Sequence, residues 1–197
     1  MKVFCKLLLI LLIGNIVFGG SFGSFQGNIS EDPINNKLYI EINDKGGVFT
    51  ESNKMSYKIV NCLVYDMNTK EKIYIFPEDN KKNISSLLFE VNYDTTEKRM
   101  ILNGEMNYSN YKMYGNRFVV NNYKLEYRLP KNKILFIISG SKTSDPDEIW
   151  TCGKSGNGLK MVKELQNNET WYIDFKHEKI IVVRQNKMET EIFEYDW

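Results

Sequence analysis

The chain contains a single histidine, His177, in Phe175-Lys-His-Glu-Lys179 between two stretches that are predicted strands. One imidazole does not make a multi-histidine metal site, and it is the only base available to a Ser–His or Cys–His pair. Its charged neighbours predict an exposed turn. We therefore expect His177 to be solvated rather than catalytic, and we assign no catalytic residue.

Two short motifs match only part of a ligand-binding loop. Gly153-Lys-Ser155 looks like the end of a phosphate-binding loop, but that loop requires a glycine where Glu148 stands, and a carboxylate there would repel phosphate. Ser144-Asp-Pro-Asp-Glu148 offers three carboxylates to Ca²⁺ but lacks the spacing and the glycine of an EF-hand. We expect a glycine-rich connection and a surface turn here, with no metal and no cofactor.

The N-terminal residues follow the order of a secretory signal peptide. Lys2 and Lys6 precede an apolar run over 7–13, Asn15 interrupts it, and the small residues Gly19 and Gly20 follow. The run is well short of the roughly 20 apolar residues that span a bilayer. The pattern predicts cleavage after Gly19, removal of residues 1–19, and a secreted, extracellular protein with no integral membrane span.

Export changes the meaning of the cysteines, because secreted proteins mature in an oxidising compartment. Cys5 leaves with the signal peptide, so the mature chain keeps only Cys62 and Cys152. The simplest interpretation is one disulfide between them, while two buried thiols or an intermolecular bridge stay open as alternatives.

Export also gives meaning to four acceptor triplets for N-linked glycans, provided that the host is a eukaryote. Any that are used must lie on the surface of the protein. They begin at Asn28, Asn83, Asn107 and Asn168.

The charge of the chain argues against polyanionic partners taken as a class. Loss of Lys2 and Lys6 changes the formal net charge from +1 to −1. Nucleic acids and anionic membranes are normally met by a clear basic excess. We therefore expect no nucleic-acid partner.

From Lys37 onward, apolar residues recur with a period of two, interrupted by turn residues, which is typical of antiparallel sheets. The alternation is clearest over 38–43, 87–94 and 123–129, where each strand should bury one face. Three further runs are apolar on both faces and predict central strands covered on two sides, namely 59–65, 134–138 and 180–183.

These patterns predict about ten or eleven strands. The fold class is all-β, an antiparallel β-sandwich; a closed, up-and-down, lipocalin-like barrel is the alternative, although the first tryptophan is Trp150 and the early Gly-x-Trp of lipocalins is missing. Leu159, Val162 and Leu165 predict at most one short helix near 158–167. We expect a flexible N-terminal arm over 20–36 and a single β domain over 37–197.

Aromatic residues make up 13% of the chain, and most of them suit strands and cores. Tyr172 is expected on the face opposite Trp171, Ile173 and Phe175. The segment from Met106 to Tyr114 gathers aromatic residues and methionines without alternation, which indicates a contact surface. The candidate contact residues are Tyr108, Tyr111, Met113, Tyr114 and Tyr172.

The favoured hypothesis is a secreted, non-catalytic binding protein that recognises an extracellular protein or glycan through its surface. A carrier with a lipocalin-like cavity for a small apolar ligand is the alternative. A carboxylate-dependent hydrolase is the least favoured, because the 25 acidic residues supply too many pairs for any one to be singled out. The sequence sets no oligomeric state.

Overall fold

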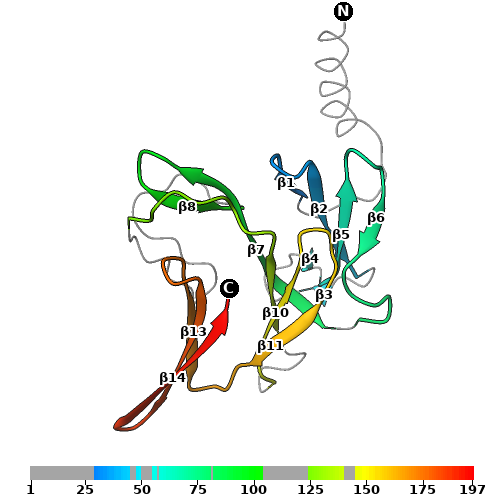
Figure 1. The fold of residues 1–197 in the computed structure, drawn as a ribbon. Coiled ribbons are helices and arrows are strands. Elements are labelled where there is room, and N and C mark those ends of the chain that lie inside the picture. Colours follow the sequence, from blue (N-terminus) through cyan, green and yellow to red (C-terminus); the bar gives the residue numbers. More distant parts are fainter. Residues whose placement is uncertain are drawn as a thin grey trace, which may run out of the picture.

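The computed structural model describes residues 29–44, 48–49, 55–56, 58–80, 82–103, 124–139 and 145–197, and every regular element among them is a β-strand (Figure 1). In chain order the strands are β1 (Ile29–Asp32), β2 (Lys37–Asn43), β3 (Val48–Phe49), β4 (Met55–Ser56), β5 (Ile59–Asp66), β6 (Lys72–Tyr74), β7 (Asn83–Asp94), β8 (Arg99–Leu102), β9 (Ile134–Ser139), β10 (Glu148–Cys152), β11 (Lys160–Glu164), β12 (Glu169–Asp174), β13 (Lys179–Asn186) and β14 (Glu189–Asp196).

The strands form three main antiparallel sheets. The first has the order β1-β2-β5-β6, the central one β11-β10-β9-β7-β8, and the C-terminal one β12-β13-β14, while β3 and β4 make a separate small pair. No sheet formed by the described strands closes on itself. The sandwich prediction is confirmed, and the closed barrel is not formed.

The central sheet is buried on both faces, and β9 shows how. Ile134, Phe136 and Ile138 point to the first sheet, where they join a core with Tyr39 and Val64. Because successive side chains of a strand point to opposite faces, the intervening residues of β9 face the C-terminal sheet. The two-sided burial predicted for this run is therefore confirmed.

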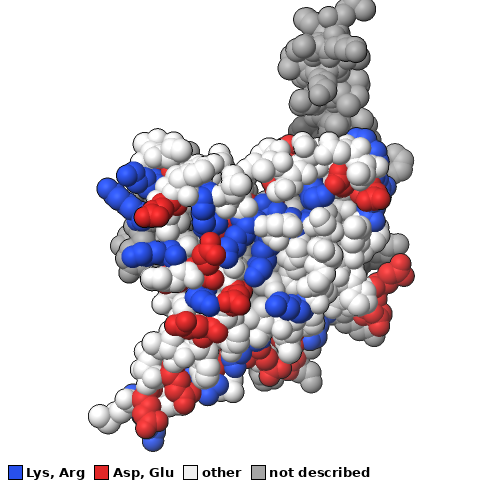
Figure 2. Space-filling model, viewed as in Figure 1, with Lys and Arg blue, Asp and Glu red and all other residues white. Residues whose placement is uncertain are grey.

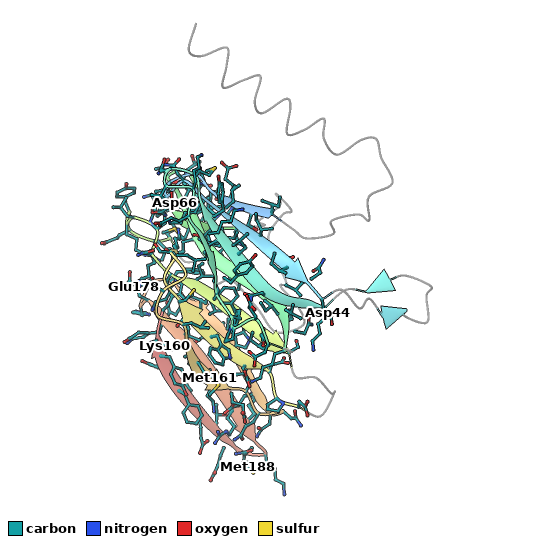
Figure 3. All side chains as sticks on the ribbon, turned by 90° about the vertical axis from the view of Figure 1, so that its right-hand side faces the viewer. Asp44, Asp66, Lys160, Met161, Glu178 and Met188 are labelled. Carbon is teal, nitrogen blue, oxygen red and sulfur yellow. The ribbon has the colours of Figure 1, made fainter. Side chains whose placement is uncertain are left out.

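The second core lies between the central and C-terminal sheets. Leu135 and Ile137 of β9 meet Trp171 and Ile173 of β12 and Val182 of β13 in one buried cluster. Figure 3 shows the result from the side, with the three sheets stacked in sequence order.

Strand β7 corrects one expectation about which faces meet water. Alternation placed Leu88 and Glu90 on a solvated face, but both are buried, because the C-terminal sheet covers that side. A charge is thus buried inside the sandwich.

Strand β2 buries the face opposite to the one that the alternation over 38–43 predicts. Tyr39 is the residue of this strand in the core, while Leu38 and Ile40 are half-buried on the outer face. Tyr39 fits the core because its ring packs on Phe89, with centroids 4.5 Å apart, and its hydroxyl donates to the Lys154 carbonyl oxygen at 3.1 Å.

The short helix predicted near 158–167 is wrong: the segment forms strand β11, which pairs with β10. The spacing of three among Leu159, Val162 and Leu165 looked helical. In the structure Leu159 packs on the core between the first and central sheets, whereas Val162 and Leu165 pack in the core between the central and C-terminal sheets. The spacing reflects burial in two cores rather than one helical face.

The strand predicted over 123–129 is also wrong for residues 124–129, which lie in an extended segment outside any sheet. Leu125 is buried and its amide donates to the Lys98 carbonyl oxygen at 2.6 Å. Beyond it the expected inward face is reversed, with Tyr127 and Leu129 exposed to 69% and 72%. Tyr123 lies outside the described residues.

Strand β1 falls within the segment expected as an arm and carries a fully buried carboxylate. Asp32 Oδ2 lies 2.7 Å from Lys154 Nζ, and both side chains are 0% exposed. Asn35 donates to Asp32 through its backbone and side-chain nitrogens, at 3.2 and 2.8 Å. Two buried charges are tolerated because each compensates the other.

No helix among the described residues is long and apolar enough to cross a membrane.

Removing one member of this pair should destabilise the fold strongly. We expect Lys154→Met to lower the free energy of unfolding by about 3–5 kcal/mol, because it leaves Asp32 buried without a cation. The double variant D32N/K154M should recover part of this loss. Urea denaturation measures the free energy of unfolding of each variant. Lys72→Met on the exposed edge strand β6 is the control. A loss of stability in Lys154→Met no larger than that in Lys72→Met would contradict a structural role for the pair.

Candidate functional site

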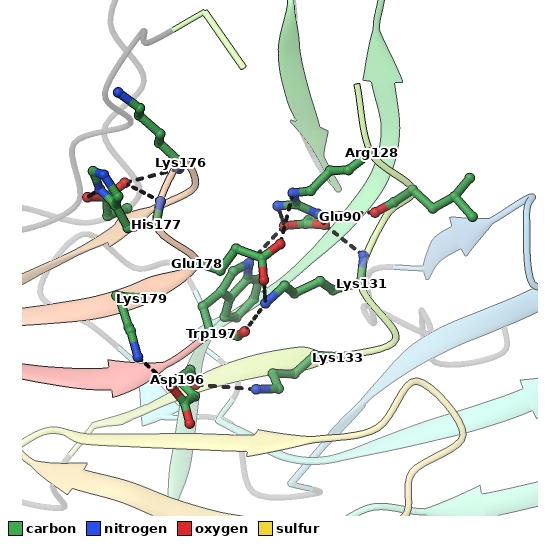
Figure 4. Close-up of polar contacts among 12 residues, drawn as sticks. Glu90, Arg128, Lys131, Lys133, Lys176, His177, Glu178, Lys179, Asp196 and Trp197 are labelled. Carbon is green, nitrogen blue, oxygen red and sulfur yellow. Dashed lines mark hydrogen bonds and ion pairs between the residues drawn. The ribbon is translucent and has the colours of Figure 1, made fainter. Parts of the chain in front are cut away.

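A second buried carboxylate, Glu90 of β7, is the centre of a network of polar contacts between the central and C-terminal sheets (Figure 4). Arg128 Nη1 and Nη2 donate to its two oxygens at 2.7 and 2.6 Å, a two-pronged pairing that fixes the guanidinium. The Lys131 amide donates at 2.7 Å and the Trp197 indole at 2.8 Å. Four hydrogen bonds thus satisfy a side chain that is 0% exposed.

These contacts set the ionisation of Glu90. Burial disfavours its charged form and by itself raises the pKa. The hydrogen bonds from Arg128, Lys131 and Trp197 outweigh that effect and lower the pKa below its ordinary value. Glu90 is therefore a carboxylate at neutral pH.

The network extends from Glu90 to the surface. Lys131 Nζ donates to the Trp197 carbonyl oxygen and lies 2.8 Å from Glu178 Oε2, and Arg128 Nε lies 3.4 Å from Glu178 Oε1. Glu178 comes from the turn between β12 and β13. The extended segment 124–133 is therefore tied to the C-terminal sheet by side chains rather than by a strand ladder.

A hollow of about 550 Å³ opens to the surface at the start of this segment. Tyr127 stands at its wall, edge-on to Tyr93 with ring centroids 5.3 Å apart, and the Tyr93 hydroxyl donates to the Leu125 carbonyl oxygen at 2.6 Å. The lining residues are Tyr93, Thr95, Lys98, Lys124, Leu125, Glu126 and Tyr127. An exposed ring beside two lysines gives the hollow both an apolar and a cationic wall.

Basic residues continue along the same segment beyond the hollow. The pKa of Lys133 is lowered. Burial is the main cause, followed by the positive charges of Lys131 and Lys160, while Asp196 and Glu178 act in the opposite direction. Figure 2 shows Lys and Arg side chains in a band across this face, along the path that the segment follows in Figure 1, with acidic side chains beside it.

The predicted contact residues are only partly described. Tyr108, Tyr111, Met113 and Tyr114 lie outside the described residues. Tyr172 is half-buried on β12, opposite the buried Trp171, Ile173 and Phe175, as the alternation predicted. The structure does not bring Tyr172 to the hollow.

Cys62 of β5 and Cys152 of β10 are free thiols in this structure, buried in the same core. Burial, followed by the nearby Cys152, raises the pKa of Cys62, and burial raises the pKa of Cys152 to about 12. Thiols held in this state are poor nucleophiles. The predicted disulfide thus has both partners in one core, but no bond joins them here.

Of the four glycan acceptors, Asn83 and Asn168 are described. Asn168 is exposed in the turn before β12 and donates to Gln185 O and Asn186 Oδ1, at 3.2 and 2.5 Å. Asn83 is half-buried at the start of β7, where its Oδ1 accepts from the Ile59 amide. Asn28 and Asn107 lie outside the described part of the chain.

The remaining sequence candidates are His177 and the acidic run over 144–148, of which residues 145–148 are described. His177 is exposed between β12 and β13, with Nδ1 2.7 Å from Asp174 Oδ2. In the acidic run, Glu148 is engaged by Lys82 Nζ at 2.5 Å and by the Trp150 indole at 2.8 Å. No group of three metal-ligating side chains occurs in the part of the chain that the structure describes.

The buried carboxylates do not resemble a hydrolase pair, which needs an acid with a raised pKa. The pKa of Glu90 is lowered. Glu169 is similar: burial raises its pKa, but hydrogen bonds from the Gln166 amide and Arg184 bring it below the ordinary value. Each is held by cations inside the fold.

The sequence reasoning missed Glu90, Arg128, Lys154 and Trp197. One weak signal was present for Glu90, since a charge within the apolar run 87–91 requires a buried partner if the strand is covered on both faces. Nothing local marked Lys154, which was assigned to a flexible glycine-rich connection. It lies instead in a tight turn in which the Gly156 amide donates to the Gly153 carbonyl oxygen at 2.8 Å.

The sequence matches no model of a known protein family. A comparison with curated proteins likewise finds no significant match. We therefore infer function from the geometry of the chain itself.

The Glu90 network should make stability depend on pH in a defined direction. A carboxylate whose pKa is lowered by folding stabilises the protein above its unfolded pKa of about 4.3, and this contribution is lost as the pH falls through the folded pKa. We expect Glu90→Gln to cost about 3 kcal/mol at pH 7 and progressively less toward pH 3.

Chemical denaturation at several pH values measures this difference. Glu97→Gln in the exposed β7–β8 turn is the control and should change little at any pH. A Glu90→Gln effect that stayed constant between pH 7 and pH 3 would show that the charge on Glu90 is not what stabilises the network.

Proposed function

We propose that this protein is a secreted, non-catalytic binding protein that recognises an extracellular protein or glycan through its surface, with the hollow at Tyr127 as the contact site. The carrying observation is the exposed Tyr127 ring, held against Tyr93 beside Lys98 and Lys124. The export pattern of residues 1–19 supports the extracellular location.

The way Tyr127 is held favours recognition over simple exposure. Its 69% exposed side chain follows the buried Leu125, which is anchored through its amide and its carbonyl oxygen. Its neighbour Arg128 is fixed on Glu90. A ring presented on an anchored backbone loses little conformational freedom on binding, and tyrosine offers both an apolar face and a hydroxyl.

A rival surface exists on the outer face of the first sheet. Ile29, Ile40, Leu63 and Tyr74 form a row across its four strands, and Ile29 and Tyr74 are exposed to 59% and 55%. The hollow is favoured because it combines an exposed ring with charged groups that give a partner direction and specificity.

Export also motivates the proposal that Cys62 and Cys152 become joined in the mature protein. Both side chains lie in one core, between β5 of the first sheet and β10 of the central sheet. Oxidation by the disulfide-forming machinery of the secretory pathway would remove one hydrogen from each thiol and link the two sheets.

The mass of the exported protein tests the location and the bridge together. Secreted from a eukaryotic host and freed of N-glycans, the protein should begin at Gly20 and weigh two hydrogens less than its reduced form. Intact-mass spectrometry with and without reductant provides the measurement. Retention of residues 1–19 would contradict export. Alkylation of Cys62 and Cys152 in denaturant before any reductant is added would contradict the bridge, because only free thiols react under those conditions.

Binding should depend on Tyr127. We expect Tyr127→Ala to weaken capture of a partner from extracellular fluid or on a glycan array by about tenfold, the loss typical of an exposed aromatic anchor. Tyr74→Ala is the matched variant, because it removes a similarly exposed ring from the rival surface. Loss of binding with Tyr74→Ala and not with Tyr127→Ala would move the site to the first sheet, and no partner at micromolar concentration would overturn the proposed function.

A further inference from the structure

Basic side chains are concentrated on the extended segment that carries Tyr127. Lys124, Arg128, Lys131 and Lys133 all belong to residues 124–133. Lys98 joins them at the hollow, and Lys160 lies near enough to Lys133 to lower its pKa. The β7–β8 turn, strand β11 and the extended segment thus all contribute cations to this surface.

Some of these charges are already used inside the fold, and others are not. Arg128 is paired with Glu90, and Lys131 with Glu178. Lys98 and Lys124 have no ion pair with any described residue, and the hollow contains one carboxylate, Glu126, against the two of them. Among the described residues, therefore, a positive charge remains available at this end of the segment.

Lys133 marks a second site, where the positive charge is only partly compensated. Its Nζ donates to the Asp196 carbonyl oxygen at 3.3 Å, a long hydrogen bond, while the Asp196 carboxylate lies 2.7 Å from Lys179. The charges of Lys131 and Lys160 lower the pKa of Lys133 more than those of Asp196 and Glu178 raise it, which supports a local positive excess beside this long hydrogen bond. An anion bound here would relieve that repulsion.

The two sites are joined by an exposed apolar stretch. Tyr127 and Leu129 are the most exposed large apolar residues between Lys124 and Lys133. A chain-like ligand could contact both ends of the segment and the exposed Tyr127 and Leu129 between them at the same time. Figures 1 and 2 show the segment and its basic band crossing the same face.

We infer that this surface, defined as residues 124–133 with Lys98 and Lys160, binds an acidic glycan chain. Acidic sugars place carboxylate or sulfate groups on rings whose faces are partly apolar, which matches lysines at both ends of a stretch that exposes Tyr127 and Leu129. A single-stranded nucleic acid would instead call for several stacking rings in sequence along a basic groove. The inference rests on the proposed function and names the ligand class for the same site.

The test uses the full secreted protein and three defined probes: a heparin oligosaccharide, a neutral dextran of similar length, and a single-stranded DNA oligomer of similar charge. We expect heparin to bind, dextran not to bind, and DNA to bind more weakly than heparin. Because exposed ion pairs are weak and screened by salt, binding should decline from 0.05 M to 1 M NaCl, where the Debye length falls to about 3 Å.

Variants then locate the interaction. Lys124→Ala and Lys133→Ala should each weaken heparin binding about two- to fivefold, and the double variant should weaken it about tenfold, as expected for exposed charge pairs. Lys72→Ala on β6 is the control, because it removes an equal charge from the first sheet. Circular dichroism of each variant confirms that the fold is retained.

Three results would overturn the inference, and they differ from failure of the proposed function. Binding of neutral glycans or of a protein alone leaves a recognition function standing and removes the acidic glycan. Equal affinity for heparin and DNA shows that charge alone is sensed. An equal loss with Lys72→Ala and Lys133→Ala places the contact elsewhere. Failure to bind any glycan or protein would remove the proposed function as well.

Discussion

Glu90 of β7 connects the two groups of buried charges in this protein, the Asp32–Lys154 pair and the Glu90–Arg128 pair, and the arrangement of the sheets depends on this connection. Lys154 Nζ donates to the Glu90 carbonyl oxygen at 2.6 Å on one face of the strand, where it also pairs with Asp32. On the other face the Glu90 carboxylate holds Arg128 and Trp197. Each charge is costly to bury alone, so the first, central and C-terminal sheets are stable only when they bring these partners together.

This constraint also places the proposed binding surface. Segment 124–133 has no strand partner, and a chain without a ladder would ordinarily be mobile. Here Arg128 and the Lys131 amide fix its middle on Glu90, and Leu125 fixes its start on the β7–β8 hairpin. The carboxylate that stabilises the interior therefore also sets the position of Tyr127 at the surface, so a change at Glu90 reaches the hollow without touching it.

The periodicity of apolar residues predicted those features of the fold that depend on residues close together in the sequence. The all-β sandwich and the inward face of β12 follow from alternation, and the two-sided burial of β9 follows from its continuous apolar run. Alternation failed at Glu90 and over 124–129 because burial there depends on partners remote in the chain, such as Trp197, which no nearby pattern announces. The same holds for Lys154, whose glycine neighbours indicate a turn but not that the turn points into the core beside Asp32.

The near-zero net charge of the chain argued against anionic partners, but net charge describes a surface only when its charges are mixed. Here they are partly separated: Glu189, Glu191 and Glu194 lie on β14, beside the exposed β13–β14 turn at Met188. The lysines follow segment 124–133 across another part of the face, with Glu178 and Asp196 beside them (Figures 2 and 3). At physiological salt the Debye length is about 8 Å, so exposed charges farther apart than this hardly sense each other. A ligand at the segment meets its local lysines rather than the average of the molecule, and a protein of almost no net charge can therefore present a basic surface.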